Sequence, residues 1–339
     1  MATVLVTGGA GYVGSVCCKQ LLDRGHKVIV IDDLSTGHAD AVPAGASFHR
    51  LDYGDRLAVS HLLRRNPVDA VFHFAAKALI PESVSNPGIF FDVNVASGIG
   101  LLETVRQFGV KRFVFSSSAA VYGSPQSVPI DEEEPKRPVN SYGETKLMLE
   151  RALEWYAKAY GWTVVAFRYF NASGAAGDLG EDHQPETHII PLLFQAATGE
   201  RNYFEIYGDD YPTPDGTCVR DYVHVSDIAA GHLCALDMPV GAGFSAYNIG
   251  TGRAYSVCEV IQVVEHVTGT SINVRYAARR PGDPAILCAS PAKLMQELKW
   301  QPRCSELQSI VRSAWDWKLR RATGYQSSSP PEQREVKIA

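Results

Sequence analysis

Short runs of β-branched and other apolar residues alternate with longer amphipathic stretches through the first half of the chain. This alternation is typical of successive β-α-β units around a parallel sheet. The predicted strands are residues 3–6, 27–31, 46–51, 70–74, 112–115 and 163–166. The predicted helices are residues 13–24, 55–64, 89–108 and 141–160. The pattern predicts a doubly wound α/β fold with helices on both faces of one parallel sheet.

The character of the chain changes after about residue 168, where loops rich in glycine, proline and acidic residues separate a few helices. These helices are expected near Ser226, Ser256, Pro291 and Ser305. We predict a first domain over residues 1–168 and a smaller α/β lobe over residues 169–326, with residues 219–236 able to return to the first domain. The serine- and proline-rich residues 327–339 are predicted to form a flexible tail.

The composition is that of an ordinary globular protein. Hydrophobic residues make up 45% and charged residues 20% of the chain, which suffices for a core and is too little charge for disorder. The net charge of -5 argues against nucleic-acid binding, which needs a basic face. The seven cysteines show no C-x-x-C spacing, so no metal ligand is predicted. No secretory pattern and no long apolar run occur, which predicts a cytoplasmic protein without a membrane segment.

A glycine-rich segment lies between the first predicted strand and the first predicted helix. Residues 7–14 read Thr-Gly-Gly-Ala-Gly-Tyr-Val-Gly. Glycines let the backbone approach a pyrophosphate, whose charge is then met by amide groups and the positive end of the helix dipole. At this junction the segment is typical of a Rossmann-type dinucleotide site. The predicted cofactor contacts here are Gly8, Gly11, Tyr12, Val13 and Gly14.

Two carboxylates end the second predicted strand. Asp32 comes 18 residues after Gly14, about where an acid should bind the adenine-ribose hydroxyls. Because Asp32 and Asp33 would repel a 2′-phosphate, the predicted cofactor is NAD and not NADP. Ligands of open α/β sheets bind at the carboxyl ends of the strands. This adds Asp52, Tyr53, Phe74, Ala75 and Ala76 to the predicted cofactor contacts.

A serine, a tyrosine and a lysine form the predicted catalytic group. Ser118 follows the fifth predicted strand, and Tyr142 and Lys146 stand four residues apart on a predicted helix, so both project from one face. A free tyrosine has a pKa of about 10, and a nearby ammonium with a positive nicotinamide would lower it. Tyr142 is therefore the predicted base, Lys146 its activator, and Ser118 the residue that holds the substrate hydroxyl.

These features together resemble the extended branch of the short-chain dehydrogenase/reductase superfamily, and most closely its UDP-glucose 4-epimerase family. The resemblance covers nearly the whole chain. It rests on residues 7–14, 115–123 (FSSSAAVYG), 168–171 (RYFN) and 215–224 (DGTCVRDYVH). It implies an isomerase in which Tyr142 takes the proton of the sugar 4-hydroxyl while NAD takes the C4 hydride. The 4-keto sugar then turns over and receives the hydride on its opposite face.

The resemblance also implies contacts for the UDP-sugar substrate. Arg220 and Arg280 would bind the diphosphate, since their forked guanidinium groups suit phosphate oxygens. Asn171 would assist them, Asp283 would hold the uridine ribose, and Tyr207 would lie beside the uracil. The remaining implied contacts are Asn94, Ser116, Tyr142, Lys146 and Tyr169 for the cofactor, and Ser118, Tyr142, His188, Ile189 and Leu287 for the substrate. A homodimer through the helices of residues 94–108 and 142–160 is expected as well.

Two positions depart from the epimerase pattern or leave it open. Lys77 directly follows Ala76, whereas the family's cofactor lysine comes one position later, so either Lys77 replaces it or the contact is lost. The family's sugar-pocket position aligns with Leu287, which is smaller than tyrosine. N-acetylated sugars would then fit, and UDP-pentoses or UDP-uronates stay open as substrates of the same catalytic group.

Two other functions compete with epimerisation. A nucleotide-sugar 4,6-dehydratase shares the cofactor and the tyrosine, but it needs an acid and a base where this chain has Ser118-Ala119-Ala120. A scaffold or NAD-sensing protein on the same fold would not need Tyr142 and Lys146. The sequence therefore favours the epimerase.

Overall fold

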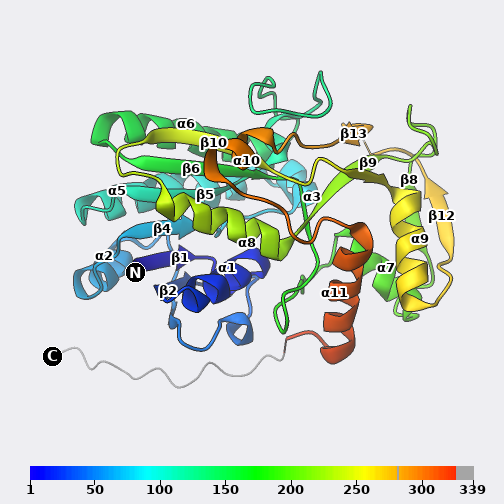
Figure 1. Ribbon diagram of the computed structural model, residues 1–339, viewed down its shortest axis with the longest axis horizontal. Coiled ribbons are helices and arrows are strands. Elements are labelled where there is room, and N and C mark those ends of the chain that lie inside the picture. Colours follow the sequence, from blue (N-terminus) through cyan, green and yellow to red (C-terminus); the bar gives the residue numbers. More distant parts are fainter. Residues whose placement is uncertain (281, 326–339) are drawn as a thin grey trace.

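The computed structural model describes residues 1–280 and 282–325, and the predicted tail lies outside this part. Its largest element is a seven-stranded sheet in the order β10-β6-β5-β4-β1-β2-β3, with every neighbouring pair parallel (Figure 1). The strands are β1 (Thr3–Thr7), β2 (Lys27–Asp32), β3 (Ser47–Arg50), β4 (Ala70–His73), β5 (Arg112–Ser118), β6 (Thr163–Tyr169) and β10 (Gly243–Ile249). The predicted doubly wound α/β fold is confirmed.

Helices cover both faces of this sheet. One face carries α1 (Tyr12–Asp23), α8 (Val225–Cys234) and α10 (Ala292–Leu298), and the other carries α2 (Arg56–Arg65), α5 (Gly98–Gln107) and α6 (Ser141–Tyr160) (Figure 1). Each layer has its own core, because strand side chains alternate between the two faces. Val4 and Val6 pack on the α1 side, whereas Leu5 packs on the α2 side. The strand order reverses between β1 and β4, so their carboxyl ends flank a ligand site of the open-sheet kind.

The structure adds elements that were not predicted. The edge strand β10 was missed because Gly241 precedes it, Gly243 begins it, and Ser245 and Asn248 stand among its apolar residues. The predicted helix 89–108 is divided into α4 (Pro87–Phe90), a π-helical segment (Phe91–Ser97) and α5. Two further helices, α3 (Ile80–Ser85) and α7 (Ile189–Ala197), were not predicted, and 3-10 turns lie at Ala39–Ala41, Ala119–Val121 and Ala235–Asp237.

A second group of elements lies beyond the carboxyl ends of the strands, around β8, α9 and α11 in Figure 1. A small sheet joins β11 (Ala254–Ser256), β9 (Val219–His224) and β13 (Ile286–Leu287), with β7 (Asn171–Ser173) beside β9. The pair β8 (Phe204–Tyr207) and β12 (Val274–Ala277) lies next to it. A separate core unites α7, α9 (Val257–Thr268) and α11 (Leu307–Arg320), so this group packs around its own apolar interior.

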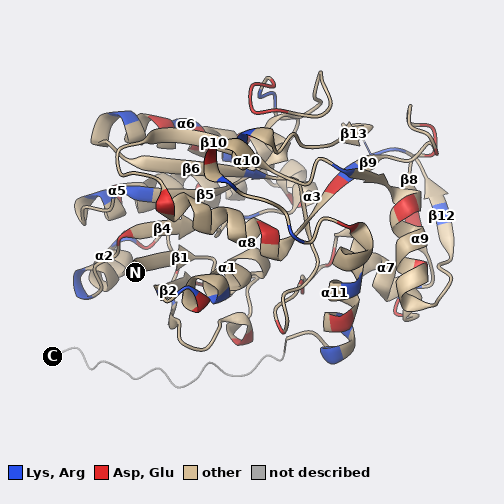
Figure 2. Ribbon diagram, in the orientation of Figure 1, with Lys and Arg blue, Asp and Glu red and all other residues tan. Residues whose placement is uncertain are grey.

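One helical stretch, Pro87–Gln107, is long and apolar enough to cross a membrane by length and composition alone. Its residues Leu101, Leu102 and Val105 are fully buried against the sheet. The apolar composition of this stretch therefore serves the protein core. Lys and Arg occur together with Asp and Glu on α6 and on α11 (Figure 2), so these helices present mixed charge.

Candidate active site

The glycine turn follows β1 where the strand order reverses. Gly8 has a φ of +73°, and a Cβ there would lie only 2.5 Å from the Ala75 amide nitrogen. A Cβ on Gly14 would lie 2.1 Å from the Gly8 carbonyl oxygen. Side chains at these positions would push the turn away from both α1 and the end of β4. The result is a bare backbone cradle at a helix N-terminus, which fits the pyrophosphate of a dinucleotide.

The rest of the turn is fastened on both sides. Gly11 precedes the first residue of α1, and Val13 packs against the sheet core. The Tyr12 hydroxyl donates a hydrogen bond to the carbonyl oxygen of Gly174. This bond ties the predicted cofactor site to the loop that follows β7.

The predicted ribose acids Asp32 and Asp33 lie at the end of β2, and the predicted cofactor contacts Asp52 and Tyr53 follow β3. Asp32 is buried and accepts hydrogen bonds from the amides of Ala10 at 3.0 Å and Leu34 at 2.9 Å, so its carboxylate bridges the glycine turn and its own strand end. Burial raises the pKa of Asp32, and the two amide hydrogen bonds oppose the rise. Asp33 accepts from the Ser35 amide at 2.8 Å. Asp52 caps its own turn, and the Tyr53 hydroxyl donates to the Val93 carbonyl.

The end of β4 is held by Asn94. Its side-chain amide accepts from the Lys77 amide at 2.8 Å and donates to the Lys77 carbonyl at 3.0 Å, and it also donates to the Thr145 hydroxyl at 3.0 Å. These three hydrogen bonds hold residues 74–77 opposite Gly8 and join them to α6. Lys77 thus has a fixed backbone beside the predicted cofactor site.

The predicted catalytic side chains meet where β5 ends and α6 begins. Ser118 is the last residue of β5 and forms a hydrogen bond with Tyr142, the second residue of α6, which Asn140 caps. The Lys146 amine donates to the Ser116 carbonyl oxygen at 2.8 Å and lies 5.8 Å from the centre of the Tyr142 ring. The structure therefore brings the predicted serine, tyrosine and lysine together.

Burial favours the neutral form of both titratable groups. It raises the pKa of the Tyr142 phenol, although the hydrogen bond with Ser118 opposes the rise. It lowers the pKa of the Lys146 ammonium to about 7, opposed by the negative charge of Glu150. The expected lowering of the Tyr142 pKa by Lys146 is therefore not found within the protein alone. The reason is that Lys146 is buried and directs its amine at the Ser116 carbonyl.

Glu150 is a buried part of this site that was not predicted. It accepts a hydrogen bond from Ser117 and forms an ion pair with Arg168 at 2.7 Å, with side chains only 3% and 5% exposed. Tyr142, Lys146 and Glu150 are spaced by four residues along α6, so they share one face of the helix. This spacing of four residues is the feature of the sequence that could have indicated that Glu150 lies beside the catalytic side chains. The pair fixes α6 against β5 and β6 directly behind the catalytic side chains.

The predicted substrate residues form two contacting pairs. The Arg220 guanidinium, at β9, forms an ion pair with the Asp283 carboxylate. The Arg280 guanidinium lies over the Tyr207 ring, 4.0 Å from its centre. Arg220 thus lies on β9, which pairs with β13, and Arg280 lies against Tyr207 at the end of β8.

The other predicted contacts are spread around this edge. The Asn171 side chain donates to the Asp221 carbonyl at 2.9 Å, and Leu287 packs against the core cluster of Val121 and Tyr122. The Tyr169 hydroxyl is hydrogen bonded to His232 at 2.8 Å.

The predicted substrate contacts Ile189 and His188 lie at the start of α7. Ile189 is the first residue of α7. His188, just before it, pairs through Nδ1 with Glu181 at 2.7 Å and with Glu186 at 3.3 Å, so it already has two carboxylate partners.

Comparison with known proteins agrees with this architecture. Residues 4–250 match the family model described as the NAD dependent epimerase/dehydratase family. A UDP-glucose 4-epimerase of Streptococcus mutans is 47% identical over 327 residues, which cover 95% of this chain and 98% of that protein. The structure of UDP-glucose 4-epimerase from Brucella ovis in complex with NAD superposes with a TM-score of 0.89 at 44% identity, covering 94% of this chain and 98% of that one.

A third relative has a broader named substrate range. The structure of the UDP-Glc/GlcNAc 4-epimerase of Campylobacter jejuni superposes with a TM-score of 0.82 at 37% identity. The superposition covers 94% of this chain and 100% of that one. Family model, sequence relatives and solved structures agree over most of the length. The chain belongs to the NAD dependent epimerase/dehydratase family, and within it to the UDP-glucose 4-epimerases.

Proposed function

We propose that this chain interconverts UDP-glucose and UDP-galactose by reversible oxidation at C4 of the sugar. The observation that carries the proposal is the meeting of Ser118, Tyr142 and Lys146 at the carboxyl edge of the sheet, beside the glycine cradle of Gly8 and Gly14. Bound NAD would supply the hydride acceptor and a positive ring that favours the Tyr142 phenolate. Residues 1–168, completed by β10, would hold the cofactor, and residues 169–326 the nucleotide sugar.

The proton chemistry belongs to Tyr142. Its phenolic oxygen would take the proton of the sugar 4-hydroxyl, and it would return that proton when the hydride returns. Ser118 would hold the same hydroxyl in line, because it already shares a hydrogen bond with the phenol. Lys146 would stabilise the phenolate from the side of Ser116. A dehydratase would need an acid and a base in place of Ala119 and Ala120, which supports the epimerase instead.

The diphosphate would hold the substrate while the 4-keto sugar turns over. Arg220 and Arg280 offer forked donors for phosphate oxygens at one edge of the site. Asp283, now paired with Arg220, would turn to the uridine ribose, and Tyr207 to the base. Turnover of UDP-galactose tests the proposal, and the product separates the two reactions, since an epimerase yields an isomer of equal mass whereas a dehydratase releases water.

Leu287 is expected to set the range of sugars. We predict that Leu287→Tyr lowers kcat/KM for UDP-N-acetylgalactosamine by more than about tenfold, because the larger side chain fills the space of the acetamido group. Turnover of UDP-galactose should stay within about threefold of the parent enzyme. Leu287→Met, which conserves volume, is the control and should change neither substrate. Equal losses on both substrates would contradict the assignment of Leu287 to the sugar pocket.

We also propose that the enzyme is a cytoplasmic homodimer. The proposed contact is a four-helix bundle of α5 and α6 from each subunit, and both helices expose apolar side chains, with Ile99, Met148 and Trp155 being 40%, 37% and 70% exposed. Met148 and Trp155 are seven residues apart, so they lie on one face of α6. All seven cysteines are free thiols, as is usual in the reducing cytoplasm.

Trp155 provides the test of the dimer. Trp155→Glu should weaken self-association at least about 30-fold, because it places two like charges in an apolar interface and removes an aromatic anchor. Sedimentation velocity over a range of protein concentrations measures this change. Leu57→Glu on α2, which replaces another exposed apolar side chain at 79% exposure, should leave association unchanged. An unaltered dimer in the Trp155 variant would exclude the α5–α6 contact.

A further inference from the structure

Four side chains with metal-binding atoms converge in the loop between β7 and α7. Glu181, His183, Glu186 and His188 follow one another in the spacing Glu-x-His-x-x-Glu-x-His. One ligand atom from each lies within 4.8 Å of all the others. This cluster lies outside the group formed by Ser118, Tyr142 and Lys146, and the proton chemistry proposed above uses none of its side chains. Of its four residues only His188 is also an implied substrate contact.

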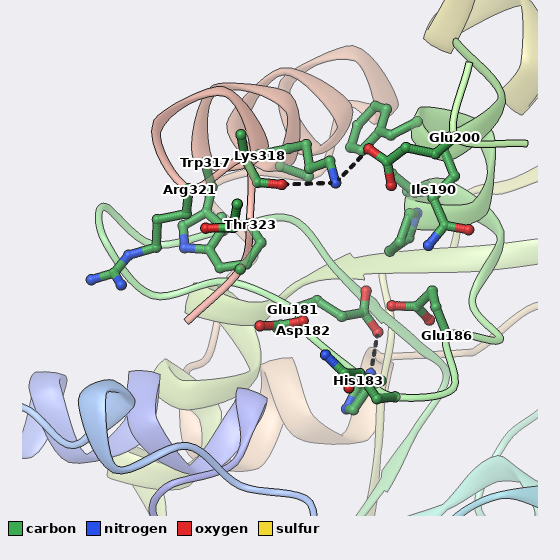
Figure 3. Close-up of a pocket in the computed structure, with 18 of the residues that line it drawn as sticks. Glu181, Asp182, His183, Glu186, Ile190, Glu200, Trp317, Lys318, Arg321 and Thr323 are labelled. Carbon is green, nitrogen blue, oxygen red and sulfur yellow. Dashed lines mark hydrogen bonds and ion pairs between the residues drawn. The ribbon is translucent and has the colours of Figure 1, made fainter. Parts of the chain in front are cut away.

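The shared centre of the cluster is one carboxylate. His183 Nδ1 lies 3.2 Å and His188 Nδ1 lies 2.7 Å from the same Glu181 oxygen, and His188 Nδ1 also lies 3.3 Å from Glu186. The side chains of both glutamates are largely buried, at 9% and 7% exposed. Figure 3 shows Glu181 and Glu186 above His183, with their polar ends turned toward one another. Two imidazoles and two carboxylates therefore point at one small volume.

His183 has a buried ring nitrogen whose only contact is an ion pair. Its Nδ1 lies 3.2 Å from a Glu181 oxygen, but no aligned hydrogen bond to it is found among the described residues. A buried ring nitrogen without a partner is costly unless something else binds it. A metal ion accepts the lone pair of a ring nitrogen without the alignment that a hydrogen bond requires.

The donor set indicates the kind of ion. Imidazole nitrogen with carboxylate oxygen suits zinc and its neighbours, whereas calcium and magnesium prefer oxygen ligands alone. Tetrahedral zinc with such ligands at about 2.0–2.2 Å holds them about 3.3–3.6 Å apart. The separations from Glu181 to His183 and from Glu186 to His188, 3.2 and 3.3 Å, are already close to this. The shorter contact between Glu181 and His188 would lengthen as the ion replaces the shared proton.

The surroundings make the cluster both accessible and rigid. It borders a pocket of about 300 Å³ whose walls come from residues 174–186, α7 and α11 (Figure 3), and His188 is 54% exposed. Among the cations of this pocket, Lys318 is already paired with Glu200 at 2.9 Å. Behind the cluster, the Gly180 amide donates to the Tyr325 hydroxyl at 3.0 Å.

The cluster also adjoins the predicted cofactor site. The His183 ring packs edge-to-face on Tyr12, with ring centres 6.4 Å apart, and Tyr12 belongs to the glycine turn. We propose that Glu181, His183, Glu186 and His188 bind a divalent transition-metal ion, with zinc as the preferred ion, and that this ion fastens the loop between the glycine turn and α11. Because the protein fills all four positions, the site is closed and its role is structural.

Zinc binding by the untagged full-length protein tests the proposal. Protein stripped with a chelator, loaded with zinc and dialysed against metal-free buffer should retain one zinc ion per chain by elemental analysis. X-ray absorption should show only nitrogen and oxygen neighbours at about 2.0–2.2 Å, since sulfur ligands would appear at about 2.3 Å. This distinction matters because the chain has seven free cysteines. Loss of all zinc on dialysis, or sulfur among the neighbours, would overturn the proposal.

Variants locate the site. The double substitution of Glu181→Gln and His188→Asn should abolish zinc retention and the rise in Tm that zinc gives the parent protein. His61→Gln on α2 removes an exposed histidine elsewhere and should keep both. Zinc retained at one equivalent by the double variant would overturn the proposal. If the double variant does not fold, the X-ray absorption spectrum of the zinc-loaded parent protein tests the proposed ligands without it.

Discussion

Tyr142→Phe is expected to reduce turnover of UDP-galactose by about 10²–10⁴-fold, the usual contribution of a positioned acid–base group. The substitution removes only the phenolic oxygen, which is hydrogen bonded to Ser118 at the end of β5. Because Tyr142 is half-buried at the start of α6 and phenylalanine has nearly the same shape, the fold and the cofactor cradle should persist. Initial rates with UDP-galactose measure the loss, and the amount of NAD released on denaturation measures cofactor binding.

A second tyrosine on the same helix gives the control. Tyr156 donates its hydroxyl to Glu103 on α5, far along α6 from Ser118. Tyr156→Phe should therefore keep turnover near the parent value. Activity of Tyr142→Phe within a few-fold of the parent would mean that another group moves the proton.

Glu150→Gln is expected to lower the free energy of unfolding by about 3–5 kcal/mol, because it leaves the buried Arg168 without its counter-charge. The two side chains are 3% and 5% exposed, and Arg168 also donates to the Tyr122 hydroxyl at 2.9 Å, so the guanidinium cannot turn to solvent. The variant should also lower the pKa of Lys146 further, since the charge of Glu150 raises it. Urea unfolding monitored by tryptophan fluorescence measures the stability.

An exposed ion pair one turn further along α6 provides the comparison. Glu154 and Lys158 lie 2.8 Å apart with side chains 46% and 61% exposed. Glu154→Gln should cost no more than about 1 kcal/mol, as is usual for surface pairs. Equal losses of unfolding free energy in the two variants would show that the burial of Glu150 does not increase its contribution to stability.

The main sheet was predictable because its strands carry uninterrupted apolar runs and its turns carry glycines. Residues 27–31 and 112–115 read as strands whatever their partners are, since a strand buried on both faces needs apolar residues throughout. The edge strand β10 has Ser245 and Asn248 in its sequence. It forms a strand only because Asn248 finds buried partners, including the Ile130 carbonyl at 2.9 Å. Such tertiary compensation is not visible in a local pattern.

The candidate site likewise has some features that the local sequence predicts and others that depend on tertiary packing. The approach of Ser118 to Tyr142 and Lys146 followed from chain order and helical spacing, which are local properties. The pairing of Glu150 with Arg168 depends on the register of α6 against β6, so no sequence rule gave it. The convergence of Glu181, His183, Glu186 and His188 was not predicted, because only cysteine spacings were considered as metal signals. Glutamate and histidine are too common on loops to indicate a site until a structure shows them converging.

Incubation of the purified protein with UDP-galactose, without added NAD, tests the central claim most directly. A cofactor retained in the glycine cradle and reoxidised in each cycle predicts conversion to an equilibrium mixture with UDP-glucose, with no net formation of NADH. UDP-N-acetylgalactosamine and UDP-arabinose in parallel reactions cover the alternative sugars. An absence of 4-epimer from all three substrates, by a protein that is folded and contains NAD, would contradict the account.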